Sequence, residues 1–214
     1  APFDPADFAE FFARIEEPGS WISMYNVETD PEYQQFLWDA LDTVRPLVDR
    51  QDPGMFNVGG FIFVSAPPSV TPFHIDRENN FWLQIRGRKH VNVWDPADRV
   101  AVSQEAVEKF ITQGSLDDVC FREDIRARSF ESDMGPGEGV YMPSTAAHMT
   151  RATTDWVRPG DGYAISIAMV FYTRATRRAA NLHALNQFLR QRGVAVAPPG
   201  ISSARDTFKF PLAR

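Results

Sequence analysis

The fold is decided by one stretch of the sequence, Thr71-Pro72-Phe73-His74-Ile75-Asp76-Arg77-Glu78-Asn79-Asn80-Phe81. Within it, His74 and Asp76 lie two positions apart, directly after a turn that contains proline. On a β-strand, residues i and i+2 point to the same face, so the imidazole and the carboxylate would converge on one point. Taken alone, such a pair is more often a hydrogen-bonded structural histidine beside a solvated aspartate. The rest of the chain has to decide between the two interpretations.

A third ligand would turn this pair into a metal site. Two imidazole nitrogens and one carboxylate oxygen on one face of an octahedron leave three positions open, as in the non-haem Fe(II) oxygenases. His148 is the natural candidate, because it follows the strand-like segment Gly139-Val140-Tyr141-Met142-Pro143. The two other histidines are predicted to lie outside the site. His90 would face away from its neighbour Lys89, and His183 would be solvated in the middle of a helix.

The composition is that of a globular protein. The chain has 214 residues, of which 43% are hydrophobic and 13% aromatic, enough for one well-buried domain. A net charge of −6 without any run of Lys or Arg predicts neither a nucleic-acid partner nor a membrane partner. No apolar run approaches the roughly 20 residues that span a bilayer, and the N-terminus lacks a signal-peptide pattern. The single cysteine, Cys120, suits a reducing cytosol, so we predict a cytoplasmic location.

Helices are predicted at both ends of a single domain that covers residues 1–214. Residues 1–50 contain two amphipathic patterns, which start at Asp4-Pro5 and Asp30-Pro31, and the second is expected to end at Pro46. A surface helix is expected over residues 103–111. The last predicted helix covers residues 174–192 and is followed by a proline-containing tail.

Residues 55–173 form the predicted β core. Short apolar or alternating runs, separated by glycine and proline, are typical of strands. An α+β fold, mainly β and built around a sandwich or barrel, follows from many short strands with helices gathered at the ends. The predicted strands are Phe61–Val64, Phe81–Arg86, Lys89–Trp94, Val140–Met142 and Tyr163–Tyr172.

Two motifs resemble the core of the JmjC and cupin-like hydroxylases. The first is T-P-x-H-x-D from Thr71, with Asn80 four residues after the aspartate, followed by Gln84-Ile85-Arg86-Gly87-Arg88-Lys89. The second, from Gly137 to His148, is similar to the G-D-x-x-Y-I-P-x-x-x-x-H segment of that family. The resemblance implies a double-stranded β-helix (a jelly roll of the cupin type) and Fe(II) held by the histidine–aspartate pair and by His148 as the distal ligand.

The resemblance also implies 2-oxoglutarate as cosubstrate. Lys89 would pair with its distal carboxylate, Thr71 would donate a hydrogen bond to the same group, and Asn80 would lie near the carboxylate at the metal. The residues themselves agree for Lys89, because it shares the apolar face of its strand with Val91 and Val93, and a buried ammonium without a partner is costly. The alternatives are a lysine at the rim that reaches water and an asparagine that only forms a turn.

The chain departs from the family in its last core strand. The family has an asparagine near the metal there, whereas this sequence offers Met169, with Ser166 as the nearest polar residue. We expect Asn80 to orient the oxoacid, helped by Ser166. If Met169 faces the metal, the pocket beside it is apolar, and if Ser166 does, the strand alignment is off by one. The aromatic pair common before the distal histidine is replaced by Ala146-Ala147, which predicts a more open pocket.

The leading hypothesis is a hydroxylase that acts on an unidentified small molecule, peptide or protein. One alternative is a cupin-like binding or regulatory protein that keeps the metal and lacks turnover, and another is a non-oxidative enzyme with Zn(II) or Mn(II). The final helix carries small and apolar residues on one side and suits either a homodimer contact or a cover for the barrel. These residues are Ala175, Ala179, Leu182, Leu185 and Leu189.

Overall fold

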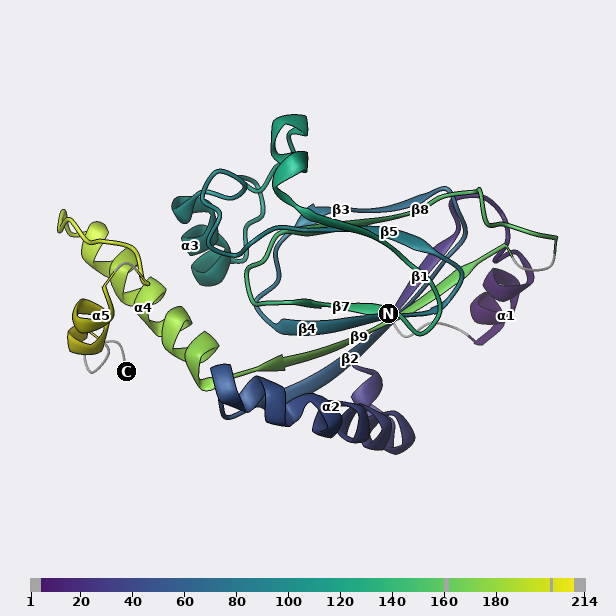
Figure 1. Ribbon diagram of the computed structural model, residues 1–214, viewed down its shortest axis with the longest axis horizontal. Coiled ribbons are helices and arrows are strands. Elements are labelled where there is room, and N and C mark those ends of the chain that lie inside the picture. The colour runs from purple at the N-terminus through teal and green to yellow at the C-terminus, as the bar shows by residue number, and fades with distance from the viewer. Residues whose placement is uncertain (1–4, 160–161, 201, 210–214) are drawn as a thin grey trace.

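Two antiparallel β-sheets face each other in the computed structural model, which describes residues 5–159, 162–200 and 202–209 (Figure 1). One sheet has five strands in the order β1-β2-β9-β4-β7, and the other has four in the order β3-β8-β5-β6. This arrangement confirms the predicted mainly β, jelly-roll architecture. The strands are β1 Trp21–Tyr25, β2 Phe56–Ser65, β3 Ser69–His74, β4 Asn79–Arg86, β5 Lys89–Val93, β6 Phe130–Met134, β7 Gly139–Met142, β8 His148–Ala152 and β9 Ala164–Tyr172.

The space between the sheets is filled by alternate residues of the strands. Strand residues point to opposite faces in turn, so every second side chain enters the core. Trp82 of β4 and Ala168 of β9 meet Val91 and Val93 of β5 there, and Met142 of β7 packs against them. The predicted inward face of residues 89–93 is therefore confirmed.

The outer face of the five-stranded sheet is covered by α2 (Pro31–Gln51). Asp30 starts this helix by accepting hydrogen bonds from the backbone N–H groups of residues 32 and 33, and Pro31 occupies its first turn. Leu37 and Leu41 then pack against Phe171 of β9. The expected end at Pro46 is wrong, because that proline lies on the exposed side, where the carbonyl that it leaves unpaired can bond to water.

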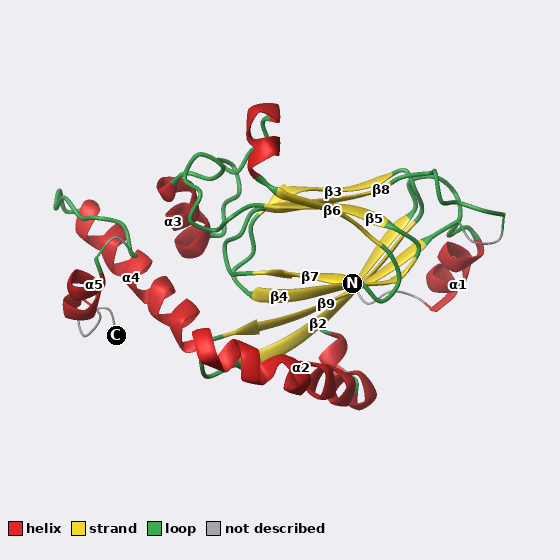
Figure 2. Cartoon of the chain, viewed as in Figure 1, coloured by secondary structure: helices red, strands yellow, loops and turns green. Residues whose placement is uncertain are grey.

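The remaining helices lie at the two ends of the sheets (Figure 2). They are α1 Pro5–Ala13, α3 Gln104–Gln113, α4 Arg174–Arg190 and α5 Ser203–Lys209, with a 3-10 turn at Glu123–Arg128. A second 3-10 turn, Val27–Thr29, lies beside α2. The sequence patterns predicted α3 and α4 closely. They did not predict α5 in the tail, β1 between the first two helices, β6, or β8, which begins at the distal histidine. None of the helices in the described ranges is long and apolar enough to cross a membrane.

Candidate metal centre

The three predicted metal ligands come together at one end of the sheets. His74 is the last residue of β3, and His148 is the first of β8. These strands are antiparallel neighbours, and their register pairs the two histidines directly. Asp76 was expected on the same strand as His74, but it lies just beyond the end of β3. The bend after His74 still brings the carboxylate to the same point.

The ligand atoms of the triad are close enough for one ion. Nε2 of His148 lies 3.4 Å from Oδ2 of Asp76, and Nε2 of His74 lies 3.8 Å from the same oxygen. All three ligand atoms are within 4.8 Å of one another. A metal at 2.0–2.2 Å from each ligand would require separations of roughly 3 to 4 Å, so the site needs little adjustment to bind.

Backbone carbonyls orient both imidazole rings. Nδ1 of His74 lies 2.7 Å from the carbonyl oxygen of Pro72, and Nδ1 of His148 lies 3.0 Å from that of Ala146. A carbonyl only accepts hydrogen bonds, so each Nδ1 carries a proton, and each Nε2 is turned toward the shared point, where it can bind a metal once it is deprotonated. Metal-binding histidines are held in this way in proteins, because the second hydrogen bond fixes the tautomer and the ring.

The loop that carries Asp76 is anchored on both sides. Ile75 points away from the triad and is fully buried in an apolar cluster with Phe73 and Trp94. The backbone carbonyl of Asp76 accepts a hydrogen bond of 2.8 Å from the N–H of Thr145. The segment before His148 is thereby tied to the segment after His74, so the two halves of the site cannot separate without breaking this contact.

The electrostatics of the triad favour metal binding. Burial lowers the pKa of His74, and the neighbouring His148 lowers it further, so its imidazole is neutral at pH 7. Burial acts to raise the pKa of Asp76, but the hydrogen bond and charge of His148 outweigh it and keep the carboxylate ionised. Burial likewise acts to lower the pKa of His148, and the Asp76 carboxylate reverses the shift. The carboxylate thus attracts a cation to this point, and a metal would replace the proton there.

The triad opens onto a cavity of about 60 Å³ between the sheets. Thr71, Asn80 and Lys89, the residues predicted to bind the cosubstrate, all line it. Asn80 is buried and its Oδ1 has no hydrogen-bond partner. The other lining residues were not predicted as part of the site: Phe61, Phe63, Trp82, Met142, Thr150 and Ala168. Strand alternation would have found Thr150, which lies two residues after His148, had β8 been recognised.

Lys89 carries a charge into this cavity without a protein partner. Its side chain is buried, and no carboxylate within the described part of the chain forms an ion pair with it. Burial lowers the pKa of Lys89 from 10.5 to about 8. The ring of Trp82, whose centroid lies 6.0 Å from Nζ, compensates only part of this cost. An anion that entered the cavity would remove this penalty.

Ser166 and Met169 do not occupy the places expected for them. Ser166 is fully buried and donates to Oε1 of Gln84 at 2.9 Å, so it does not line the cavity. Met169 points to the other side of β9 and packs against the outer helix, while Ala168 lines the cavity. The strand alignment was therefore off by one residue. Met169 does not line the cavity, and the wall that Ala168 provides is apolar.

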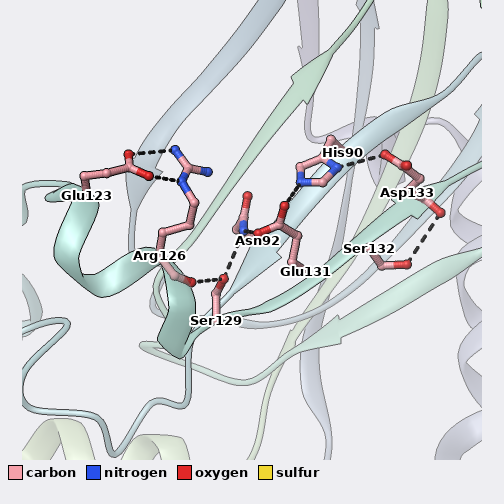
Figure 3. Close-up of polar contacts among 8 residues, drawn as sticks. All are labelled: His90, Asn92, Glu123, Arg126, Ser129, Glu131, Ser132 and Asp133. Carbon is pink, nitrogen blue, oxygen red and sulfur yellow. Dashed lines mark hydrogen bonds and ion pairs between the residues drawn. The ribbon is translucent and has the colours of Figure 1, made fainter.

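The two remaining histidines differ in their surroundings. His90 lies on the outer face of its sheet, between Asp133 at 2.8 Å and Glu131 at 2.6 Å (Figure 3). It belongs to a polar network on the face of the sheet that points away from the metal cavity, so the prediction that His90 lies outside the site is confirmed. The prediction that His183 is solvated is wrong, because α4 packs against α3 and buries it beside Glu108.

Comparisons with known proteins give the fold and the family. A model of the cupin-like domain matches residues 5–177. An X-ray structure of E. coli ycfD aligns with 100% of this chain and 50% of that one, at 16% identity and a TM-score of 0.49. A crystal structure of the Escherichia coli ribosomal oxygenase YcfD aligns with 100% and 49%, at 16% identity and a TM-score of 0.48. A structure of FeII HppE aligns with 53% and 42%, at 14% identity and a TM-score of 0.32.

These structural similarities are too low to carry an argument about activity. The chain spans about half the length of the ycfD structures that it matches. The search of curated proteins found no match. The family model covers most of the chain, and the two facing sheets and the triad agree with it. The chain therefore belongs to the cupin-like domain family.

Proposed function

We propose that this chain is an Fe(II)- and 2-oxoglutarate-dependent oxygenase, and that it hydroxylates a second substrate. One observation carries the proposal: a His-Asp-His triad and a buried lysine without a protein partner share a single cavity. A triad alone would suit several metals and several reactions. The lysine adds a requirement for an anionic ligand beside the metal, which a simple metal-binding cupin does not need.

The residues present fit Fe(II). Two neutral imidazoles and one carboxylate suit a divalent ion of this group, and three ligands leave positions open for a cosubstrate. His74 and His148 would bind through Nε2, and Asp76 through Oδ2. When bound, the iron would supply the redox chemistry that couples decarboxylation of 2-oxoglutarate to hydroxylation, with one oxygen atom of O₂ entering succinate and the other the substrate.

Three side chains would position 2-oxoglutarate. The Lys89 ammonium would pair with the distal carboxylate, and the Thr71 hydroxyl would donate a hydrogen bond to it. Asn80 would contact the carboxylate nearer the metal, because its amide faces the cavity with an unpaired atom. Rotation of that amide presents either its oxygen or its nitrogen. The aromatic and apolar walls keep water out of the cavity and strengthen these contacts.

Metal binding is tested with a matched pair of variants. His148→Ala should lose Fe(II) after dialysis, measured by elemental analysis, whereas His90→Ala should retain one ion per chain, because His90 faces the other side of its sheet. Circular dichroism reports whether both variants are folded. Full metal content in folded His148→Ala would refute the triad.

The cosubstrate is tested by the release of succinate from 2-oxoglutarate in the presence of Fe(II), O₂ and ascorbate. Release by the wild type supports the oxygenase. A protein that binds metal and never releases succinate would instead be a binding protein, or a Zn(II) or Mn(II) enzyme of a different reaction. A reducing cytosol, which maintains Fe(II) and the free exposed Cys120, is the compartment that we propose.

A further inference from the structure

A groove of about 840 Å³ lies at the end of the sheets that carries the metal ligands. It is bounded by α3, by α4 and by the loops that lead into and out of the strands. Figure 1 shows α3 and α4 beyond the same end of the two sheets, with the end of α2 below them. The volume is within the range of about 300–1,000 Å³ that is usual for ligand sites.

The floor of the groove consists of the segments that hold the triad. Ser144 and Thr145 line it, and they lie a few residues before the distal ligand His148. The Ser144 hydroxyl donates to the carbonyl of Arg77 at 2.8 Å, and the Thr145 N–H donates to that of Asp76. A molecule in the groove would therefore rest on the loops that position the metal ligands.

Three arginines line this groove in a chain whose net charge is −6. Arg77 follows the metal ligand Asp76, Arg99 comes from the loop before α3, and Arg177 from the first turn of α4. None of the three lies within 4.0 Å of a carboxylate in the described residues. Burial lowers the pKa of Arg99, although Asp95 and Asp98 act to raise it from a greater distance. Arg77 also donates a hydrogen bond of 2.9 Å to the carbonyl of Phe110. The one lining carboxylate, Asp52, is already engaged by Thr173 and by a backbone N–H at the start of α4.

Asn79 adds a buried donor without a partner. Its Oδ1 accepts hydrogen bonds from the Tyr141 hydroxyl at 2.9 Å and from the Ser144 N–H at 3.1 Å. A backbone N–H only donates, so the oxygen is fixed in that position and Nδ2 occupies the other. Asn79 is 3% exposed, lines the groove, and leaves Nδ2 unpaired. An acceptor on a ligand would satisfy it.

Apolar side chains separate the cations. Phe56 lies beneath Arg177, whose guanidinium carbon is 5.6 Å from its ring centroid, and Val107 and Ile111 of α3 line the opposite wall. The charges act on different groups around the groove, since Arg77 acts to lower the pKa of Tyr172 and Arg99 acts to lower that of His183. A compact anion would meet one arginine, whereas an extended molecule would meet several.

From this geometry we infer that the groove binds an acidic peptide segment, next to the loops that hold the metal ligands. Carboxylates of the peptide meet Arg99 and Arg177, a backbone carbonyl meets Asn79 Nδ2, and apolar side chains lie on Phe56. The Arg77 end of the peptide lies beside the loop that carries Asp76. An extended peptide places its same-side residues at successive points along the groove, and the three arginines likewise come from three different segments around it. A nucleic acid would need a continuous basic track, which these three arginines do not form.

Direct binding to metal-free protein tests the inference. The probe is a fluorescein-labelled peptide of about ten residues with alternating Glu and Ala, which places its carboxylates on one side of an extended chain. Fluorescence anisotropy should show binding that weakens with salt and exceeds that of a Gln-Ala peptide. The double variant R99Q/R177Q should bind about tenfold more weakly. The control R45Q removes an arginine of α2 outside the groove and should bind like the wild type.

Each other outcome overturns the peptide assignment. Equal affinity for the acidic and neutral peptides, or for the wild type and R99Q/R177Q, would remove the role of the groove cations. Competition by citrate at the affinity of the peptide would point to a small acid, and tighter binding of oligo(dT) to a nucleic acid. Because no metal is present, these results are independent of succinate release. If the peptide does not bind but succinate is released, the proposal that the chain is an oxygenase still stands. If the peptide binds but the metal does not, only the oxygenase proposal is refuted.

Discussion

Replacing Lys89 by methionine tests two effects of this residue separately: its effect on the stability of the fold and its role in binding 2-oxoglutarate. Methionine has a similar length and no charge, so it fills the same space in the cavity between the sheets. In the ligand-free protein the ammonium is buried without a counter-ion, and burial lowers its pKa from 10.5 to about 8. A residue that serves only stability would not be placed in this way.

The size of the effect follows from that shift. At 1.36 kcal/mol for each pH unit, the buried charge costs about 3 kcal/mol near pH 7. The contact of Nζ with the Trp82 ring, at 6.0 Å from its centroid, offsets about 0.5–1 kcal/mol and is lost in the variant. We therefore expect Lys89→Met to raise the free energy of unfolding of the metal-free protein by about 2 kcal/mol.

The stabilisation by Lys89→Met should decrease as the pH rises. Below pH 8 the lysine is charged in both states, and the folded state bears the full cost. Between about pH 8 and 10.5 the unfolded state binds more protons, so the stability of the wild type rises with pH. The advantage of Lys89→Met should thus be largest at pH 7 and about half as large at pH 9.5. Urea unfolding at both pH values measures it.

Activity should change in the opposite direction. The stabilised variant should lose succinate release at ordinary 2-oxoglutarate concentrations, and 2-oxoglutarate should stabilise the wild type but not Lys89→Met. Equal or lower stability of the variant at pH 7 would refute the argument that the lysine is buried at a cost. An unchanged KM for 2-oxoglutarate would refute its role in binding.

Three further substitutions test separate parts of the structure. Ser166→Ala should destabilise the fold by about 1–3 kcal/mol, because Gln84 Oε1 loses its buried partner, and should leave the KM for 2-oxoglutarate unchanged; a raised KM would restore the cosubstrate role first predicted. Trp94→Phe removes the donor to the carbonyl of Ile125 at 2.8 Å and should cost a similar amount in urea unfolding, and a neutral result would contradict the bond. Gly139→Ala would place a methyl group 2.6 Å from a backbone oxygen of β4, and thermal unfolding should show a loss of at least about 1 kcal/mol.

The triad was predictable because it depends on local rules. His74 and Asp76 lie two positions apart, and His148 follows a strand pattern in a motif with fixed spacing. Lys89 was predictable for the same reason, since strand alternation alone places it with Val91. Even the error about Asp76 was harmless, because the loop is pinned by the buried Ile75 between the two ligands.

The orientation of β9 was not predictable from alternation. Ala168 faces the cavity and Met169 faces α2, yet both are buried, as are most residues of this strand. A strand covered on both faces is apolar throughout, so its sequence carries no period of two. The burial of His183 was hidden for a related reason, since it depends on the packing of α4 against α3, which no local pattern encodes.

Asn79 and Asn80, at the start of β4, contribute to the groove and to the metal cavity respectively. They are consecutive in β4 and point to opposite faces, so Asn79 lines the groove and Asn80 lines the metal cavity. Each is buried and has an unpaired polar atom, which a fold selected for stability alone would have satisfied or replaced. The two unpaired atoms are explained together if the groove and the cavity each receive a polar ligand. Because the two asparagines share a peptide bond, an occupant of the groove would bear on the side chain that orients the oxoacid, and the two ligands should bind interdependently.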